Sequence, residues 1–354
     1  PVTSAAEPAA ENSYRSAYRL ADEGLVILDQ RRIPEALEEV AAKRGSDVAY
    51  YLRLGVARGG PLMAQLAAYG LWLTATERVD MPPEQRRVEL RRTEQALVDA
   101  RPSSRPLAAA VARMHAVTAR FGVSAVGTEV AEAMRVEADA IAGEVTAAEA
   151  RLASRLEAVL PQPEGRPLTL LLHGGQGSLV AGQLGATLTA LNRMRDAGRE
   201  LQVFLTEGRP FMDGARLASW ELRQSGIEHK VVPDAASAWL LARMPFDAVV
   251  VRGEWQAADG DTAALVGARA LAQLAAAARD HNGHPRFVMV TPSMAMDADT
   301  ADGDAIPSEL RPSRELSAYL SDTPIRTSDA LVPAADVVPS ELIEVIVTDG
   351  EPAA

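Results

Sequence analysis

The sequence contains no cysteine and has only two lysines, Lys43 and Lys230, among its 354 residues. The absence of cysteine excludes disulfides, thiolate zinc sites and a cysteine nucleophile. The scarcity of lysine leaves two candidates for Schiff-base chemistry and makes nearly all of the positive charge arginine. Because arginine presents a planar fork of donors, this composition favours bidentate binding of anions.

Long apolar runs and basic clusters are also missing. No apolar stretch reaches the roughly 18 residues that a membrane-spanning helix needs, and residues 1–13 are small and polar, unlike a signal peptide. The 36 basic and 48 acidic residues give a net charge of −12. A chain of this charge repels nucleic-acid backbones. We therefore expect a soluble, cytoplasmic protein that binds neither membranes nor nucleic acids.

The length predicts about two domains. The pattern of apolar residues along the chain changes near residue 160. Before that point, apolar residues recur every three or four positions, which is typical of helices, and the last long helix is predicted over 128–160. One extended piece interrupts this pattern at 25–28. The proline-rich segment 161–167 predicts a linker between domains at 14–160 and 168–348.

After residue 167, short apolar runs alternate with helical segments, which predicts a parallel sheet covered by helices on both faces. In such sheets, ligands bind beyond the carboxyl ends of the strands. The predicted strands lie at 168–172, 201–205, 228–232, 248–251, 286–290 and 342–347. The predicted helices lie at 178–196, 213–225, 235–243 and 263–280.

The first of these strands ends in the turn His-Gly-Gly-Gln-Gly at 173–177. Its glycines would let backbone N–H groups approach an anion at the start of the next helix, and they equally suit a tight turn that needs positive φ. The dinucleotide-binding pattern is incomplete, because Val180 stands where a third small residue is required. The turn is therefore a candidate anion site and a poor match to a nicotinamide site.

Two arginines lie beside other turns. Arg58 is followed by Gly-Gly-Pro, and Arg101 is followed by Pro-Ser-Ser-Arg, which adds Ser103 and Arg105. An arginine in such a position can clamp a phosphate with its fork of donors. Each one alone is more often an ordinary surface arginine, but their occurrence together in a chain with so few lysines suggests an anion site.

Glu254 follows the fourth predicted strand and precedes Trp255. Burial there would raise its pKa toward the range of a general base, whereas the alternative is a solvated loop carboxylate. The acidic stretch 297–304 lacks the glycine and glutamate positions of a calcium loop, and the five histidines form no HExxH pair. We therefore expect no metal site.

Several motifs occur in a fixed order along nearly the whole chain. They are Ile-Leu-Asp-Gln at 27–30 with Pro34, Arg-Gly-Gly-Pro at 58–61 through Ala-Ala-Tyr-Gly at 67–70, Ala-Arg-Pro-Ser at 100–103, Thr-Glu-Gly-Arg-Pro at 206–210, Asp-Gly-Ala-Arg-Leu at 213–217 with Trp-Glu-Leu at 220–222, Ala-Ala-Asp-Gly-Asp-Thr at 257–262, Asp-Gly-Asp-Ala-Ile-Pro at 302–307 with Glu-Leu-Arg-Pro at 309–312, and Asp-Val-Val-Pro at 336–339 with Glu-Leu-Ile at 341–343. In this order the chain resembles the methylthioribose-1-phosphate isomerases, with the related ribose-1,5-bisphosphate isomerases and the regulatory subunits of translation initiation factor 2B.

The resemblance implies an α/β fold in which a smaller, mainly helical N-terminal domain with a short sheet precedes a Rossmann-like C-terminal domain with a mostly parallel sheet. It also implies a homodimer and an interdomain cleft for the aldose-to-ketose conversion of a 5-substituted ribose 1-phosphate, without metal or organic cofactor. The family's phosphate binding carries over onto Arg58, Gly59, Gly60 and Arg101. The other candidate contacts to the substrate or its phosphate are Ser103, Arg105, Gly175, Gln176, Gly177 and Arg209.

The chain departs from the family pattern at positions that the family uses for chemistry. Gly174 stands at the place of a catalytic Cys, and Glu254 stands at that of a catalytic Asp. The other departures are Asp213 for a Gln, Trp255 for an Arg, Ala264 and Leu265 for an Asn-Lys pair, and Pro106 for an Asn. The loss of one positioned acid or base typically costs on the order of 10²–10⁴ in rate.

Two functions of different classes follow from this pattern. In the first, the chain is an enzyme that acts on a modified ribose phosphate, with Glu254 as the base and Asp213 or His173 as its partner. Arg58 and Arg101 then clamp the phosphate. In the second, the chain is catalytically inactive and serves as a sugar-phosphate binder or an oligomeric, regulatory scaffold. The polar groups that converge on the strand ends favour the enzyme.

Overall fold

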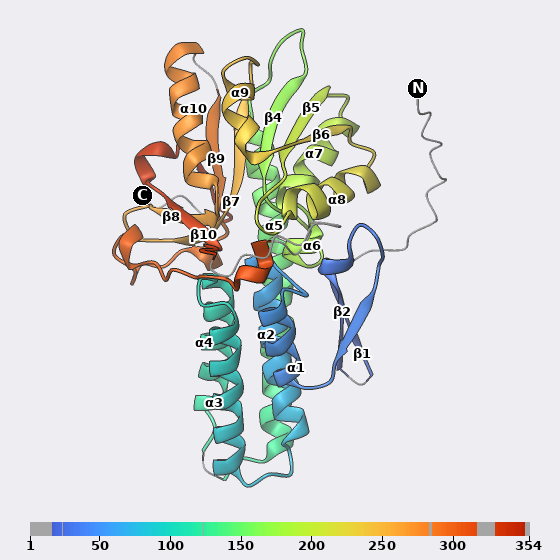
Figure 1. Ribbon diagram of the computed structural model, residues 1–354. Helices are drawn as coiled ribbons and strands as arrows, with labels where there is room; N and C mark the ends of the chain where they lie inside the picture. Colours follow the sequence, from blue (N-terminus) through green and yellow to red (C-terminus); the bar gives the residue numbers. More distant parts are fainter. Residues whose placement is uncertain (1–15, 23, 123, 283–284, 317–329, 351–354) are drawn as a thin grey trace.

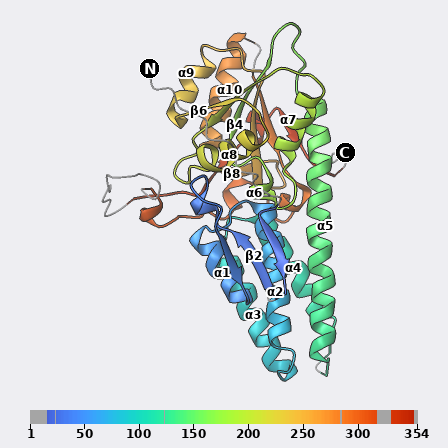
Figure 2. The same cartoon turned by 90° about the vertical axis from the view of Figure 1, so that its right-hand side faces the viewer.

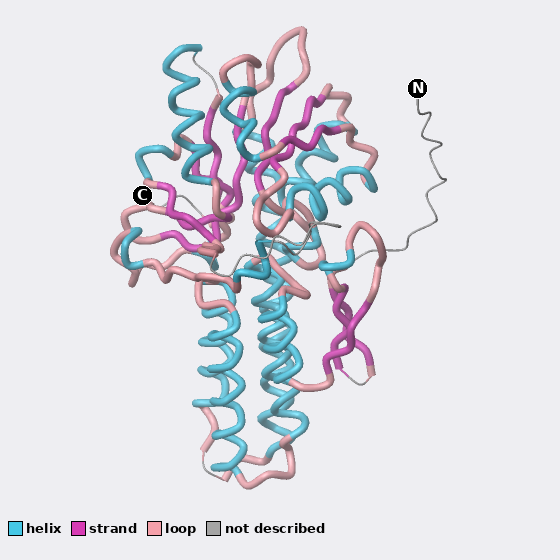
Figure 3. Tube along the Cα trace, viewed as in Figure 1, coloured by secondary structure: helices cyan, strands magenta, loops and turns pink. Residues whose placement is uncertain are grey.

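The computed structural model describes residues 16–22, 24–122, 124–282, 285–316 and 330–350. The segment 1–13, with its predicted polar character, lies outside the described residues. Figure 1 shows a bundle of long helices below a larger body that contains the main sheet, and Figure 3 separates the helices and strands by colour. Within the described residues, no helix is both long enough and apolar enough to cross a membrane.

The helical body is built around one enclosed helix. The four helices that run side by side in Figure 1 are α1 (Gly45–Leu54), α2 (Gly60–Glu77), α3 (Pro83–Ala100) and α4 (Arg105–Ala119). All residues of α2 from 60 to 71 are buried, so its neighbours surround it. Pro61 in its first turn needs no intrahelical hydrogen-bond donor and fixes the start of the helix. This start lies at the end of the bundle that faces the sheet body.

A small antiparallel sheet lies beside these helices. It consists of β1 (Tyr18–Ala21), β2 (Gly24–Leu28) and β3 (Glu39–Ala42), in the order β1-β2-β3. The extended piece predicted at 25–28 is its central strand. The two outer strands were not predicted from the sequence, because they are short and partly exposed and lack a clear alternation of apolar residues.

One helix connects the two bodies. Helix α5 (Gly127–Val159) starts and ends one residue before the predicted limits of 128 and 160, and Figure 2 shows it along the whole length of the molecule. Met134 and Ile141 belong to the core of the helical body, whereas Leu152 and Leu156 belong to a core of the sheet body. The helix therefore contributes to both cores, and the domain division at 161–167 stays a prediction.

The predicted parallel sheet is confirmed, since each of the six predicted runs overlaps one strand. The strands are β4 (Leu168–His173), β5 (Leu201–Thr206), β6 (His229–Val232), β7 (Ala248–Gln256), β9 (Arg286–Val290) and β11 (Val345–Val347). They pair in the order β6-β5-β4-β7-β9-β11, all parallel. The direction of strand addition reverses between β4 and β7, as in a Rossmann-like fold.

The two faces of this sheet form separate cores, as alternation along a strand requires. Leu170 and Leu172 of β4 pack with α5, α7 (Ala186–Asp196) and α8 (Ser219–Gln224). Leu171 points to the opposite face and packs with α9 (Ser237–Leu241) and α10 (Ala268–Asn282). The sheet is thus covered on both faces, and its polar edge at the carboxyl ends remains for a ligand.

The second half of β7 leaves the parallel sheet. Beyond Arg252 it pairs antiparallel with β8 (Thr262–Leu265), which in turn pairs antiparallel with β10 (Ala335–Val338). A register shift between Gly253 and Trp255 marks this transition. The sequence did not predict β8 and β10, and it predicted β7 only as far as residue 251. The extension carries Glu254 beyond the edge of the parallel sheet.

Candidate functional site

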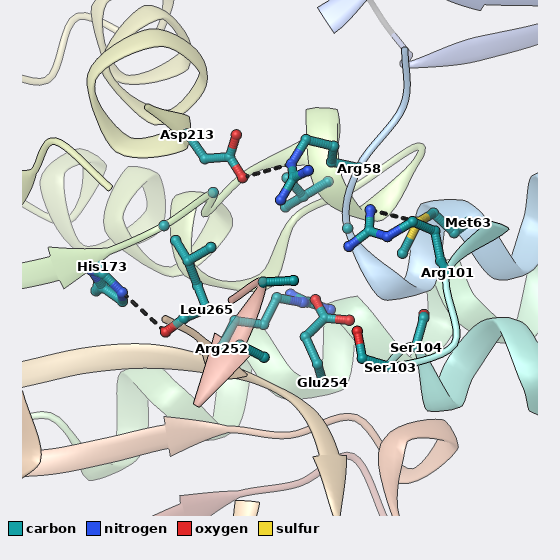
Figure 4. A pocket seen from close by; sticks show the side chains of 16 residues that line it. Arg58, Met63, Arg101, Ser103, Ser104, His173, Asp213, Arg252, Glu254 and Leu265 are labelled. Carbon is teal, nitrogen blue, oxygen red and sulfur yellow. Dashed lines mark hydrogen bonds and ion pairs between the residues drawn. The ribbon is translucent and has the colours of Figure 1, made fainter. Parts of the chain in front are cut away.

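A cavity lies where the helical body meets the sheet body (Figure 4). It adjoins the carboxyl ends of β4 and β7, between which the strand order reverses, and open α/β sheets bind their ligands at such a point. The lining residues from the helical body are Arg58, Gly59, Met63, Arg101, Ser103 and Ser104. Those from the sheet body are His173, Gly174, Gly175, Val180, Asp213, Arg252, Glu254, Leu265, Ala334 and Ala335.

The two glycines after Arg58 allow the bodies to approach closely. Gly59 has a φ of 100°, and a Cβ atom there would lie 2.2 Å from the backbone oxygen of Val180. A Cβ atom at Gly60 would lie 2.4 Å from Oε2 of Glu254. The Gly60 N–H instead donates a hydrogen bond to Oε1 of Glu254 at 3.2 Å. These glycines therefore place the first turn of α2 directly against the candidate base.

Arg58 is buried and forms an ion pair across the cavity. Its Nε donates to Oδ2 of Asp213 at 3.1 Å, and its guanidinium carbon lies 3.5 Å from the centre of the Phe211 ring. Asp213 follows β5 and immediately precedes the π-helical turn η2 (Gly214–Ala218). Its other oxygen, Oδ1, is buried without a hydrogen-bond partner among the described residues. Buried polar atoms are nearly always paired, so this oxygen is available to a ligand.

Arg101 and Ser103 both contact Glu309. Arg101 Nε lies 3.0 Å from Oε1 of Glu309, and the Ser103 hydroxyl donates to Oε2 at 2.6 Å. Burial alone would raise the pKa of Glu309, but Arg101, Ser103 and then Arg311 more than offset this effect and lower it. The ionised Glu309 thus fixes Arg101 in the cavity wall. The neighbouring Ser104 presents a buried hydroxyl for which the described residues supply no partner.

Glu254 has the surroundings of a tunable acid or base. Burial raises the pKa of its carboxyl above the ordinary value of 4.5. Four groups oppose this rise, in the order Arg252, the Gly60 N–H, Arg101 and Arg58. The carboxyl lines the cavity and contacts the start of α2, so the alternative of a solvated loop carboxylate is wrong.

His173 lines the cavity, but both of its ring nitrogens already have partners. Nδ1 lies 2.7 Å from Oγ1 of Thr206, and Nε2 lies 3.3 and 3.1 Å from the backbone oxygens of Leu265 and Val266. Because carbonyl oxygens only accept, Nε2 carries the hydrogen and Nδ1 accepts from the Thr206 hydroxyl. Burial lowers the pKa of His173, which keeps the ring neutral. Of the two predicted partners for Glu254, Asp213 is therefore the one with an available atom.

The end of the glycine-rich turn and the start of the next helix hold a carboxyl group, and that group is a side chain of the protein. The backbone N–H of Leu179 and the hydroxyl of Ser178 donate to Oε1 of Glu221 at 2.9 and 3.1 Å. A Cβ atom at Gly177 would lie 2.4 Å from the same carboxyl group. The start of α6 (Ser178–Ala181) is thus occupied by Glu221, from α8. Of the glycines in this turn, Gly174 and Gly175 line the cavity and Gly177 does not.

Other predicted contacts lie outside the cavity lining. Gln176 is buried and donates from Nε2 to the backbone oxygen of His173 at 2.6 Å. Arg105 pairs with Asp297, with 3.1 Å between Nε and Oδ2. Arg209 donates through its side chain to the backbone oxygen of Leu316. These residues and Gly177 thus have structural partners, and they do not join Arg58 and Arg101 at the cavity.

Several lining residues were not predicted from the sequence, and Arg252 is the most prominent of them. It stands inside β7 and is only 7% exposed. Its Nη1 donates to Oε2 of Glu149 in α5 at 3.1 Å. A charged residue that directly continues the apolar run 248–251 was the available signal. Leu265 was noted only as a departure, and it closes the cavity at Gly174, where a Cβ atom would lie 3.1 Å from its Cδ2.

Within the described part of the chain, no group of three or more histidine, aspartate or glutamate side chains is arranged to hold a metal ion. Two carboxylates are instead paired with the arginines of the cavity wall: Asp213 with Arg58, and Glu309 with Arg101. The chemistry that these residues offer is therefore anion binding by guanidinium groups and proton transfer by carboxyl groups.

The sequence is similar over nearly its whole length to known proteins. The model of the initiation factor 2 subunit family matches residues 56–350. A methylthioribose-1-phosphate isomerase from Chloroflexus aurantiacus is 34% identical over 331 residues, which cover 93% of this chain and 92% of that protein.

Solved structures show the same fold. The crystal structure of 5-methylthioribose 1-phosphate isomerase from Pyrococcus horikoshii OT3 aligns with a TM-score of 0.79 at 25% identity, covering 95% of this chain and 92% of that one. The delta subunit of translation initiation factor eIF-2B from A. fulgidus aligns with a TM-score of 0.74 at 22% identity, covering 95% of each chain, and supports the fold alone. On the family match and the sequence identity together, the chain belongs to the initiation factor 2 subunit family.

Proposed function

We propose that the chain binds a phosphorylated pentose in the cavity and converts a modified ribose 1-phosphate from an aldose to a ketose. The observation that carries the proposal is the buried Oδ1 of Asp213, which has no partner among the described residues and lies on the residue that Arg58 binds. An anion clamp beside an unpaired acceptor suits a ligand that carries both a phosphate and hydroxyl groups. The names of the curated relatives support the same substrate class.

Arg58 and Arg101 would hold the phosphate. Each pairs with a carboxylate through Nε, which fixes the guanidinium group and leaves terminal nitrogens for phosphate oxygens. Figure 4 shows Arg58 beside Asp213 and Arg101 beside Met63. The buried Ser104 hydroxyl offers a further neutral donor at this end.

Glu254 would move the proton. Conversion of a ribose 1-phosphate into the ketose moves one hydrogen from C2 to C1, while the proton of the C2 hydroxyl passes to the ring oxygen as the ring opens. This balance needs no oxidant and no reductant. Glu254, with its raised pKa, can accept the C2 hydroxyl proton and return it to the ring oxygen, while Asp213 Oδ1 can accept a hydrogen bond from a sugar hydroxyl.

We further propose, from the resemblance of the sequence to the isomerases, that the protein is a cytoplasmic homodimer that works without an organic cofactor or metal ion. The acidic net charge of −12 supports a role apart from nucleic acids.

A binding protein without catalysis is the second candidate, and one observation favours it. The cavity wall at Gly174, Leu265, Ala334 and Ala335 carries no group that can transfer a proton or attack a carbonyl. A site that keeps its arginines but lacks reactive groups on this wall would bind a sugar phosphate without changing it.

One experiment separates the two candidates. Methylthioribose 1-phosphate is incubated with the wild-type protein, with Glu254→Gln and with Arg58→Ala, and formation of the ketose is followed by NMR while binding is measured by calorimetry. The isomerase requires ketose formation by the wild type, none by Glu254→Gln, and similar affinity in both. Binding without turnover in the wild type would establish the second candidate, and no binding at all would reject both.

A further inference from the structure

Arg252 enters the cavity wall from β7 with its guanidinium group held at one end only. Glu149 of α5 accepts from both terminal nitrogens, Nη1 and Nη2, and its Oε2 also accepts from the backbone N–H of Ala186 at 2.8 Å. Glu149 is completely buried, so the pair is shielded from solvent. This arrangement fixes the plane of the guanidinium group and thereby the direction of its Nε–H.

The Nε–H of Arg252 has no partner in the described part of the chain, and its Nε is buried. An arginine that is 7% exposed and lines a cavity rarely leaves a donor unpaired, because a buried unsatisfied group costs about 1–3 kcal/mol. An oxygen atom of a bound ligand would remove this cost.

The position of Arg252 distinguishes it from the phosphate clamp. It is two residues from Glu254 on β7, and of the three arginines that act on the Glu254 carboxyl it has the strongest effect, ahead of Arg101 and Arg58. Figure 4 shows it beside Glu254 on the strand side of the cavity, whereas Arg58 and Arg101 enter from the helical body. A ligand oxygen that meets Arg252 is therefore close to the one that meets Glu254.

We propose that Arg252 is a further ligand-binding residue, whose Nε–H donates to the sugar oxygen on which Glu254 acts, while Glu149 holds its terminal nitrogens. The inference rests on the proposed function and extends it, because it assigns a donor to the reacting end of the sugar instead of to its phosphate. It requires a substrate with an oxygen at this position and disfavours a deoxy analogue that lacks it.

The test compares side chains that differ only in the donor. In the background Glu149→Gln, which removes the buried negative charge, Arg252→Gln places an amide nitrogen where Nε lies, and Arg252→Met places a methyl group there. Affinities of the wild type and both double variants for methylthioribose 1-phosphate and for inorganic phosphate are measured by calorimetry. Melting temperatures confirm that each variant is folded.

We expect the Gln variant to bind the sugar phosphate within about threefold of the wild type and the Met variant to bind it about tenfold more weakly, as the loss of one hydrogen bond predicts. Inorganic phosphate should bind all three proteins equally. Equal affinity of the Gln and Met variants for the sugar phosphate would overturn the inference, and so would a parallel loss for inorganic phosphate, which would assign Arg252 to the phosphate.

A second variant covers the case in which the double variants do not fold. Arg252→Lys keeps the charge that Glu149 needs but has a methylene group in place of Nε, so we expect about tenfold weaker binding of the sugar phosphate. Arg166→Lys is the matched control, because Arg166 pairs with Asp247 at the opposite, amino end of the sheet. Unchanged affinity in Arg252→Lys would contradict the inference. Failure of the wild type itself to bind the sugar phosphate would instead refute the proposed function.

Discussion

Arg58 and Asp213 join the helical body to the sheet body through an ion pair in which Nε lies 3.1 Å from Oδ2, and the two side chains are only 9% and 8% exposed. Removal of one partner from a buried pair leaves the other charge uncompensated, which typically costs about 3–5 kcal/mol. The same pair also orients the unpaired Oδ1 of Asp213. Stability and ligand binding are therefore coupled at this contact.

Arg58→Ala should lower the free energy of unfolding by about 3 kcal/mol and weaken phosphate and sugar-phosphate binding at least about tenfold. Denaturant unfolding and calorimetry measure the two effects. Arg105→Ala serves as the control, because its partly exposed pair with Asp297 is worth about 1 kcal/mol or less and lies outside the cavity lining. Wild-type affinity in Arg58→Ala would remove Arg58 from the phosphate clamp.

The rate of ketose formation should depend on the ionisation of Glu254. Burial raises the pKa of this carboxyl, and the form that accepts a proton is the ionised one, so we expect kcat to rise with pH through a midpoint above the ordinary value of 4.5. Of the neighbouring groups, Arg252 opposes this rise in pKa most strongly. Because Arg252→Lys keeps the positive charge, the midpoint of its pH–rate profile should also lie above 4.5. A pH–rate profile that is flat through the acidic range would show that another group limits the reaction.

Glu221 should make the protein more stable at acidic than at neutral pH. Burial raises its pKa to about 7 even though the turn at 177–179 donates hydrogen bonds to it. Between 4.5 and about 7 the folded protein holds a proton that the unfolded chain has released, so stability falls as pH rises through this window, by up to about 3 kcal/mol.

Glu221→Gln removes this titration, and the pH dependence of the unfolding free energy should become flatter over the same window. Asp297→Asn is a suitable control, since Asp297 lies at a partly exposed pair far along the chain from the turn. An unchanged slope in Glu221→Gln would mean that the carboxyl is already ionised in the folded protein.

A side chain at Gly174 should lower the free energy of unfolding by more than the strain of a left-handed backbone alone. Gly174 has a φ of 78°, and Leu265 Cδ2 would lie 3.1 Å from a new Cβ atom. Gly198 has a similar φ of 84° with nothing within 4 Å. We expect Gly198→Ala to lower the free energy of unfolding by about 1–2 kcal/mol, and Gly174→Ala to lower it by more. The difference between the two should become smaller when Gly174→Ala is combined with Leu265→Ala.

Thermal or denaturant unfolding of the wild type, the two single variants and the double variant measures these changes in the free energy of unfolding. The result also states the cost of introducing a cysteine at 174, the position at which the resemblance places a catalytic one. Equal destabilisation in the two single variants would show that Leu265 moves away freely and does not close this part of the cavity.

The pattern of apolar residues predicted the strands correctly where burial requires apolar side chains. All six predicted strand runs overlap strands. Burial on both faces explains the mostly apolar parallel parts of the central strands β4 and β7, whereas the edge strand β6 is partly exposed. The helix predicted over 178–196 is broken into α6 and α7, because Gly182 takes a φ of 104° and Gly185 packs against the backbone of Gly177. The break depends on this contact between distant residues, which the spacing of apolar residues along the sequence does not reveal.

The sequence alone determined the parallel sheet, the long helix α5, the pairing of a helical body with a sheet body, and the arginines and carboxylates from which the cavity is built, since these depend on composition, spacing and ordered motifs. The tertiary structure decided which polar atoms remain free. Glu221 packs against the turn at 173–177, and both ring nitrogens of His173 have partners. Asp213 Oδ1 and Arg252 Nε have none among the residues that the structure describes. Hydrogen-bond partners that are distant in the chain meet only after folding. The polar atoms that remain unpaired after folding are the ones that can bind a ligand.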